Sequence, residues 1–133
     1  MSRQQLVLAL SVAAGGALGS VGRFLVGLAI PYRDQGLPLA TLLVNVVGCF
    51  AIGVIVRWAA ATSEAATVLR LFLVTGVCGG FTTFSAFSAE TVRMLEGGAV
   101  GRALLYVALS VAASLTATAL GFLVARAATA SVV

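Results

Sequence analysis

Residues 71–89 read LFLVTGVCGGFTTFSAFSA, a stretch of 19 residues without a charged side chain. A helix that rises 1.5 Å per residue needs roughly 20 apolar residues to cross a hydrocarbon core about 30 Å thick. The middle of the stretch, residues 79–83, is a poor helix former, because glycine and β-branched threonine both disfavour a helix. The stretch therefore predicts a membrane-spanning helix that is broken near the bilayer midplane, close to Gly80.

Three more charge-free windows flank this one, at residues 4–22, 35–56 and 103–125, with lengths of 19, 22 and 23 residues. Only 9% of the chain is charged and 61% is hydrophobic, whereas a soluble domain has about 25% charged residues. This composition excludes a water-soluble globule and an independent soluble domain. The sequence predicts an all-α membrane protein, a single domain of four transmembrane helices at approximately 4–28, 37–56, 68–94 and 103–125.

The charged residues carry information about topology. The net charge is +4, but the eight arginines are spread over the chain and form no basic face for nucleic acid. Four spans place four arginines on the side of the termini (Arg3, Arg57, Arg70 and Arg126) and four on the opposite side (Arg23, Arg33, Arg93 and Arg102). Orientation in the membrane normally follows an excess of Lys and Arg on the cytoplasmic side. Equal numbers of arginines on the two sides therefore select no orientation. Either Arg23 lies inside the membrane, or the chain inserts in both orientations and pairs with an inverted copy of itself.

Asn45 sits at the centre of the second window, where an unpaired amide costs several kcal/mol. It therefore faces another helix or a wet pathway, and interhelical hydrogen bonding is the plainer interpretation. In the third window Phe81, Phe84 and Phe87 share one helix face, beside Ser85. Aromatic rings have a positive edge, so rings presented edge-on next to hydroxyl and amide donors suit a small anion. Simple lipid-facing or core bulk is the alternative for the phenylalanines.

The fourth window carries Tyr106, Ser110, Ser114 and Thr118 at a spacing of four, which places their hydroxyls in one stripe. Any single one of them can instead bond back to the carbonyl four residues earlier. The windows contain no Asp, Glu, His or Lys, so a buried proton relay is excluded. The pattern favours passive selection of a small anion by neutral donors, without enzymatic chemistry.

Arg23 and Glu90 stand at the ends of their windows, where a pathway would open. Arg23 there raises the local concentration of anions, or else it only snorkels to the interface. Whether Glu90 pairs with Arg93, with Arg23 or with neither stays open. Cys49 and Cys78 lie within spans, and without histidine or a CxxC spacing they predict packing rather than a metal site.

Three runs of residues give the chain a family resemblance over essentially its whole length. They are Gly15-Gly16-Ala17-Leu18-Gly19-Ser20 with Arg23, then residues 41–48 (TLLVNVVG), and above all residues 79–90 (GGFTTFSAFSAE). In these runs the chain resembles the Fluc, or CrcB-type, fluoride channels of bacteria. Two departures are mild: Ala86 stands where the family commonly has threonine, and Cys49 where glycine or serine is usual.

The resemblance implies a fluoride-selective channel of the bacterial inner membrane that exports cytoplasmic fluoride passively. It implies an antiparallel homodimer, of dual topology, with two pores. Phe84 and Phe87 are then the pore-facing ring edges with Asn45 and Ser85 near them, and the polar stripe of the fourth span lines the same path. Arg23 lies near a pore vestibule. The backbone carbonyls of Gly79 and Thr82 from both subunits hold a structural sodium ion on the two-fold axis.

Two other functions remain open from the sequence. A small dual-topology, proton-coupled multidrug exporter also has four spans, but it needs a carboxylate in its first helix, and residues 4–22 contain none. A non-conducting assembly subunit would use the Gly15-xxx-Gly19 motif and the amide for packing. In such a subunit the stripe of hydroxyl groups on the fourth span would have no function.

Overall fold

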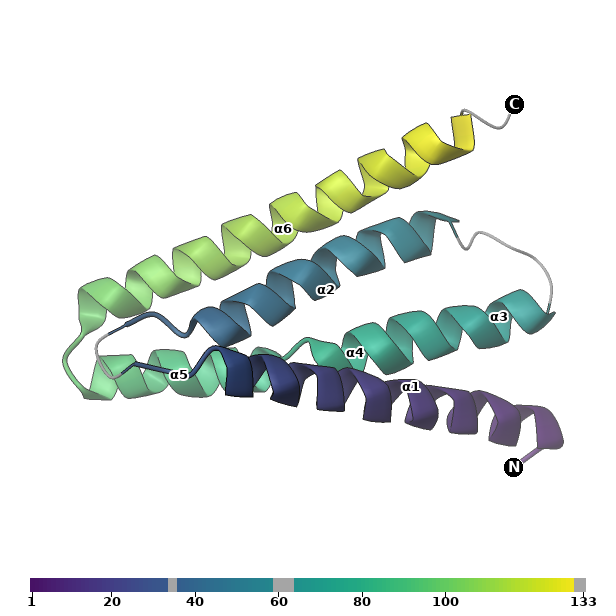
Figure 1. Cartoon of the computed structure of the whole chain (residues 1–133), viewed down its shortest axis with the longest axis horizontal. Helices are drawn as coiled ribbons and strands as arrows, with labels where there is room; N and C mark the ends of the chain where they lie inside the picture. Colours follow the sequence, from purple (N-terminus) through teal and green to yellow (C-terminus); the bar gives the residue numbers. More distant parts are fainter. Residues whose placement is uncertain (34–35, 59–63, 131–133) are drawn as a thin grey trace.

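The computed structural model describes residues 1–33, 36–58 and 64–130, and it contains no strand in these ranges. Figure 1 shows the helices as roughly aligned rods, with both termini at one end of the molecule. In chain order they are α1 (Arg3–Ala29), α2 (Leu39–Trp58), α3 (Glu64–Arg70), the π-helix η1 (Leu71–Cys78), α4 (Gly79–Phe81), α5 (Phe84–Glu96) and α6 (Val100–Ala130).

Four helical stretches are long and apolar enough to cross a membrane, which confirms the predicted number of spans. They are Arg3–Ala29, Leu39–Arg57, Ala66–Glu96 and Val100–Ala128. The chain direction alternates from one span to the next in Figure 1. Four arginines therefore lie in the half of the molecule that holds the termini and four in the other half, as the count of spans requires (Arg3, Arg57, Arg70 and Arg126 against Arg23, Arg33, Arg93 and Arg102).

The helices associate in two closely packed pairs: α1 lies along η1 and α4, and α2 lies along α6. Glycines stand where the backbones approach. A Cβ on Gly15 would collide with the carbonyl of Phe72, and a Cβ on Gly53 would collide with the carbonyl of Thr118. Since lipid offers no hydrophobic drive between helices, such close approach stabilises the pairs by dispersion contacts. The two glycines of the Gly15-xxx-Gly19 motif therefore pack α1 against η1.

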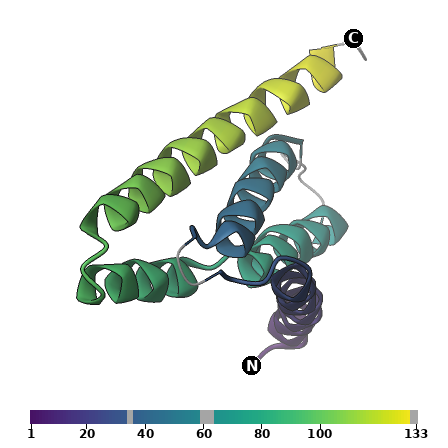
Figure 2. The same ribbon diagram turned by 60° about the vertical axis from the view of Figure 1, so that its left-hand side comes forward.

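The third span is not one uniform helix. The π-helix η1 runs into α4, which ends at Phe81, and α5 begins at Phe84. Between them Thr82 and Thr83 have extended backbone, with φ, ψ of −78°, 158° and −152°, 112°. Figure 2 shows α5 leaving the direction of α3 and α4 and running towards the start of α6. The extended residues face α2, and the candidate site is built around them.

Candidate functional site

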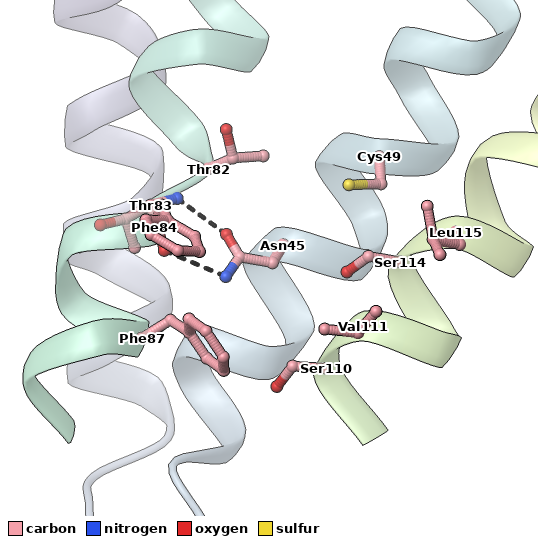
Figure 3. Close-up of a pocket in the computed structure, with 10 residues that line it drawn as sticks. All are labelled: Asn45, Cys49, Thr82, Thr83, Phe84, Phe87, Ser110, Val111, Ser114 and Leu115. Carbon is pink, nitrogen blue, oxygen red and sulfur yellow. Dashed lines mark hydrogen bonds between the residues drawn. The ribbon is translucent and has the colours of Figure 1, made fainter. Parts of the chain in front are cut away.

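Asn45 holds the extended segment through both atoms of its amide. The N–H of Thr83 donates to Oδ1 of Asn45 at 2.7 Å, and Nδ2 of Asn45 donates to the carbonyl of Thr83 at 3.1 Å (Figure 3). Asn45 is therefore engaged with the protein, as interhelical hydrogen bonding predicts. Thr83 is only 8% exposed and lies outside any helix or strand, so its backbone N–H and carbonyl need other partners. The amide of Asn45 supplies both.

Thr83 also starts the helix that carries the phenylalanines. Its Oγ1 accepts the N–H of Ala86 at 3.1 Å, which makes it the N-cap of α5, and it shares a hydrogen bond of 3.1 Å with Oγ of Ser85. A threonine cap satisfies one of the free amides at a helix start. The backbone position fixed by Asn45 therefore sets the position of the first residue of α5, Phe84.

A pocket of about 330 Å³ opens between this segment, α2 and α6. Every lining side chain is uncharged, and Figure 3 shows them arranged around the amide of Asn45. The pocket brings together six of the predicted site residues with four others. The predicted ones are five of the eight pore residues and one carbonyl residue, and the full lining is Asn45, Cys49, Thr82, Thr83, Phe84, Phe87, Ser110, Val111, Ser114 and Leu115. Apolar walls with a few polar groups are typical of small-ligand sites.

The two predicted rings form a tilted row with a third aromatic residue. The ring centroids of Phe84 and Phe87 are 5.5 Å apart at an interplanar angle of 45°, and those of Phe87 and Tyr106 are 5.3 Å apart at 50°. Rings in such tilted pairs do not stack face to face, and their edges carry the positive end of the quadrupole. Phe84 is 78% exposed on the single chain, which leaves its ring open to whatever covers this face.

The polar stripe of the fourth span divides into parts with different partners. Ser110 and Ser114 line the pocket, and Ser110 is 6% exposed with no hydrogen-bond partner for its Oγ among the described residues. Thr118 instead directs its Oγ1 to the carbonyls of Cys49 and Ser114, each at 3.1 Å. The row thus offers two hydroxyls to the pocket, and its far end bonds to backbone.

Glu90 is bound by hydroxyl groups from two other helices. Thr41 Oγ1 donates to one of its carboxylate oxygens at 2.7 Å, and the hydroxyl of Tyr106 donates to the other at 2.7 Å. Tyr106 is fully buried and Thr41 is 8% exposed. Among the described residues Glu90 pairs with neither Arg23 nor Arg93, which answers the question left open by the sequence. Tyr106, Glu90 and Thr41 form a hydrogen-bonded cluster one turn of α6 from Ser110.

Arg23 turns onto the end of α4. Its Nε donates to the carbonyl of Gly80 at 3.1 Å, and Oγ of Ser20 reaches the same oxygen at 3.5 Å. A cation here interacts favourably with the negative C-terminal end of the preceding helix. Arg23 does not line the pocket, and its side chain joins α1 to the segment just before the extended residues.

The backbone carbonyls of Gly79 and Thr82 are candidate oxygen ligands for a cation. No group of three or more His, Cys, Asp or Glu side chains gathers in the described ranges. Thr82 directs its own N–H and Oγ1 to the carbonyl of Cys78, both at 2.9 Å. Neither the Gly79 carbonyl nor the Thr82 carbonyl receives a hydrogen bond from a described residue outside its own helix. These carbonyls fit a hard cation, which prefers oxygen ligands.

Besides the apolar Val111 and Leu115, three residues of the site were not predicted from the sequence. Thr83 and Cys49 line the pocket, and Thr41 binds Glu90. Thr83 follows the glycines by three residues and directly precedes a serine-rich helix start, so its capping role had a signal in the sequence. The hydrogen bond between Thr41 and Glu90 joins residues 49 positions apart, and no pattern in the sequence indicated it.

Comparison with known proteins shows that the chain is similar to members of one family. The family model described as "CrcB-like protein, Camphor Resistance (CrcB)" matches residues 10–122. The protein named "Fluoride-specific ion channel FluC" of Roseobacter denitrificans is 49% identical over 119 residues, which is 86% of this chain and 92% of that protein. Proteins of the same name from Agrobacterium fabrum and Chlorobaculum tepidum are each 46% identical, over 116 and 117 residues. The matches cover 86% and 88% of this chain and 93% of each relative.

Proposed function

The chain belongs to the CrcB-like family, and on that basis we propose that it is a fluoride-selective channel that lets cytoplasmic fluoride leave the cell passively. Its family makes it a transporter and not an enzyme. With four membrane-spanning helices it is a multi-pass membrane protein, which in bacteria places it in the inner membrane.

The observation that carries the proposal is the uncharged pocket around Asn45. Fluoride must give up much of its hydration shell to pass, so the protein has to replace water with donors of similar strength. The amide of Asn45, the hydroxyls of Ser110 and Ser114 and the ring edges of Phe84 and Phe87 offer such donors in one place. The unpartnered hydroxyl of Ser110 supports this use, because a buried donor without a partner costs about 1–3 kcal/mol.

Neutral donors also suit conduction. Binding must be favourable enough for an ion to enter and weak enough for it to leave, and a lysine or arginine in the pocket would hold fluoride too tightly. We place Ser85 and the Tyr106–Glu90 cluster at one end of the path and Thr118 at the other, with Arg23 near a vestibule. Fluoride enters cells as neutral HF, and the negative-inside membrane potential, about 2.3 kcal/mol per charge per 100 mV, drives the anion out.

We further propose an antiparallel homodimer with two pores. Three observations support it: the arginines divide equally between the two halves of the molecule, Phe84 is 78% exposed beside the pocket, and the pocket opens to the surface of the single chain. An inverted second copy would cover Phe84 and close the path from the opposite side.

The dimer proposal predicts labelling from both faces of the membrane. Glu96→Cys, in a chain with Cys49→Ser and Cys78→Ala, should react with a membrane-impermeant maleimide in two fractions, about half from outside the cell and the rest only after permeabilisation. Glu96 is exposed and is the last residue of α5, next to the turn that leads to α6. Labelling confined to one side would contradict dual topology and leave the fluoride proposal standing.

In such a dimer, the Gly79 and Thr82 carbonyls of both subunits would hold a structural sodium ion on the two-fold axis. Their lack of hydrogen-bond partners and the exposure of Gly79 support this assignment. A bound sodium ion supplies a fixed positive charge, and the chain's own part is to present the carbonyl oxygens.

The function is tested by anion efflux from liposomes. With valinomycin present to carry the compensating potassium, we expect rapid fluoride efflux from proteoliposomes and at least about tenfold slower chloride efflux, a difference of about 1.4 kcal/mol in barrier height. Efflux of neither anion, or equal efflux of both, would contradict the proposal. Proton-coupled uptake of a cationic drug in the same vesicles would favour the exporter instead.

A further inference from the structure

The extended residues disrupt hydrogen bonds that a continuous helix would have made across them, and two of these bonds involve the carbonyls of Gly79 and Gly80. In an α-helix the N–H of Thr83 would donate to the carbonyl of Gly79, and the N–H of Phe84 to that of Gly80. Here the Thr83 N–H donates to Oδ1 of Asn45 at 2.7 Å. The Gly80 carbonyl is served by Nε of Arg23 at 3.1 Å and by Oγ of Ser20 at 3.5 Å.

The carbonyls of Gly79 and Gly80 therefore differ in their hydrogen-bond partners. The Gly80 carbonyl accepts hydrogen bonds from side chains of α1. The N–H of Thr83, which would serve the Gly79 carbonyl in a helix, donates to Asn45 instead, and no other described residue donates to the Gly79 carbonyl. Gly79 is exposed on the single chain. Its carbonyl is free because of the bond that Asn45 makes with the next turn.

The same amide also faces the pocket. Nδ2 of Asn45 carries two hydrogens, and one of them is used by the Thr83 carbonyl at 3.1 Å. Asn45 lines the pocket, and no other acceptor among the described residues takes the second hydrogen. That hydrogen is available to an anion, while Oδ1 stays bound to the Thr83 N–H.

We propose that Asn45 is a positioning residue that couples the anion pocket to the free Gly79 carbonyl: its Oδ1 diverts the Thr83 N–H from Gly79, while its remaining amide hydrogen serves the anion. This inference deepens the proposed function and rests on it. The bond from the Thr83 N–H to Oδ1 of Asn45 thus leaves the Gly79 carbonyl free for a cation, and the same amide offers its other hydrogen to an anion in the pocket. Removing the amide disturbs both.

Two substitutions at position 45 separate the roles. Asn45→Ala removes the acceptor, so the Thr83 N–H can return to the Gly79 carbonyl. Asn45→Asp has the same shape and keeps an oxygen for the Thr83 N–H, but it loses the amide hydrogens and adds negative charge to the pocket. Ser114→Ala is the matched control, because it removes a pocket hydroxyl that makes no hydrogen bond to the extended segment among the described residues.

The test measures the unfolding temperature of the detergent-solubilised protein in sodium chloride and in N-methyl-D-glucamine chloride at equal ionic strength, together with fluoride efflux. We expect sodium to raise the unfolding temperature of the wild type. Asn45→Ala should lose at least half of this sodium-dependent increase, whereas Asn45→Asp and Ser114→Ala should keep it. Fluoride efflux should fall at least about tenfold in both Asn45 variants, or about 1.4 kcal/mol.

The outcomes distinguish the coupling from the channel itself. A full sodium-dependent increase in Asn45→Ala, or none in the wild type, would overturn the coupling even if the wild type conducts fluoride. A wild type that passes no fluoride would overturn the proposed function, whatever the melting data show. If Asn45→Ala does not fold, Asn45→Ser takes its place, since its shorter side chain cannot bond both Thr83 groups. Retention of the full increase in that variant would equally overturn the coupling.

Discussion

Replacing Phe87 by isoleucine is expected to reduce fluoride efflux at least tenfold while leaving the protein folded. Phe87 lies between Phe84 and Tyr106, with centroid distances of 5.5 and 5.3 Å, and it lines the pocket. Isoleucine keeps apolar bulk but has no positive ring edge, and aromatic interactions of this kind are worth about 0.5–1.5 kcal/mol each. Loss of about 1.4 kcal/mol of stabilisation in the path corresponds to a tenfold slower flux.

Phe24→Ile is the control, since it makes the same chemical change at a residue of α1 that is 63% exposed and does not line the pocket. Both variants should elute as the wild type does on size exclusion in detergent. Unchanged fluoride efflux in Phe87→Ile would show that the ring edge of Phe87 does not contribute to fluoride passage. An equal loss in Phe24→Ile would show that any large phenylalanine change impairs the protein.

The second large effect is on stability, at Gly19. A Cβ at this position would collide with the carbonyl of Val77 and lie 2.7 Å from the amide nitrogen of Phe81, so α1 would have to move away from η1 and α4. Overpacking typically costs 1–3 kcal/mol, and here the obstructing atoms are backbone and cannot rotate aside. Gly19→Ala should therefore lower the unfolding temperature in detergent and the yield of folded protein, with a cost of about 2 kcal/mol or more.

Gly27→Ala on the same helix is the matched control, because a Cβ there meets no atom within 4 Å. Alanine is the better helix former by about 1 kcal/mol, so this variant should be as stable as the wild type or slightly more so. Equal stability of Gly19→Ala and Gly27→Ala would contradict the close packing of α1 on the third span.

The number of membrane spans was predictable because lipid imposes a simple rule. A span needs about 20 uncharged residues, and charged residues delimit four such windows. The helices themselves extend beyond the windows, since α1 continues through Arg23 to Ala29 and α6 begins at Val100, before Arg102. The glycine-rich sequence of residues 76–80 also indicated that the third span would not be a regular helix. However, the glycines themselves remain helical in η1 and α4, and the extended residues are Thr82 and Thr83. Asn45 accounts for this displacement, because it offers partners to the Thr83 backbone.

The composition of the site was less accessible to sequence reasoning, because it depends on which helices meet. Spacing on α6 placed Ser110, Ser114 and Thr118 in one stripe, but only the packing of α6 on α2 turns Thr118 towards the carbonyl of Cys49. In the same way, Glu90 stood at the end of a window with arginines nearby, and two hydroxyls bind it instead. Local periodicity predicts the face of a helix, and tertiary contacts decide what that face touches.

The most direct test of the central claim, that neutral groups in this pocket select fluoride, is the reversal potential of the current through the protein in a planar bilayer with fluoride on one side and chloride on the other. We predict a reversal potential displaced by more than about 59 mV in the direction of fluoride permeability, which corresponds to a permeability ratio above ten for a singly charged ion. A reversal potential near zero, with fluoride and chloride carrying equal current, would contradict the account.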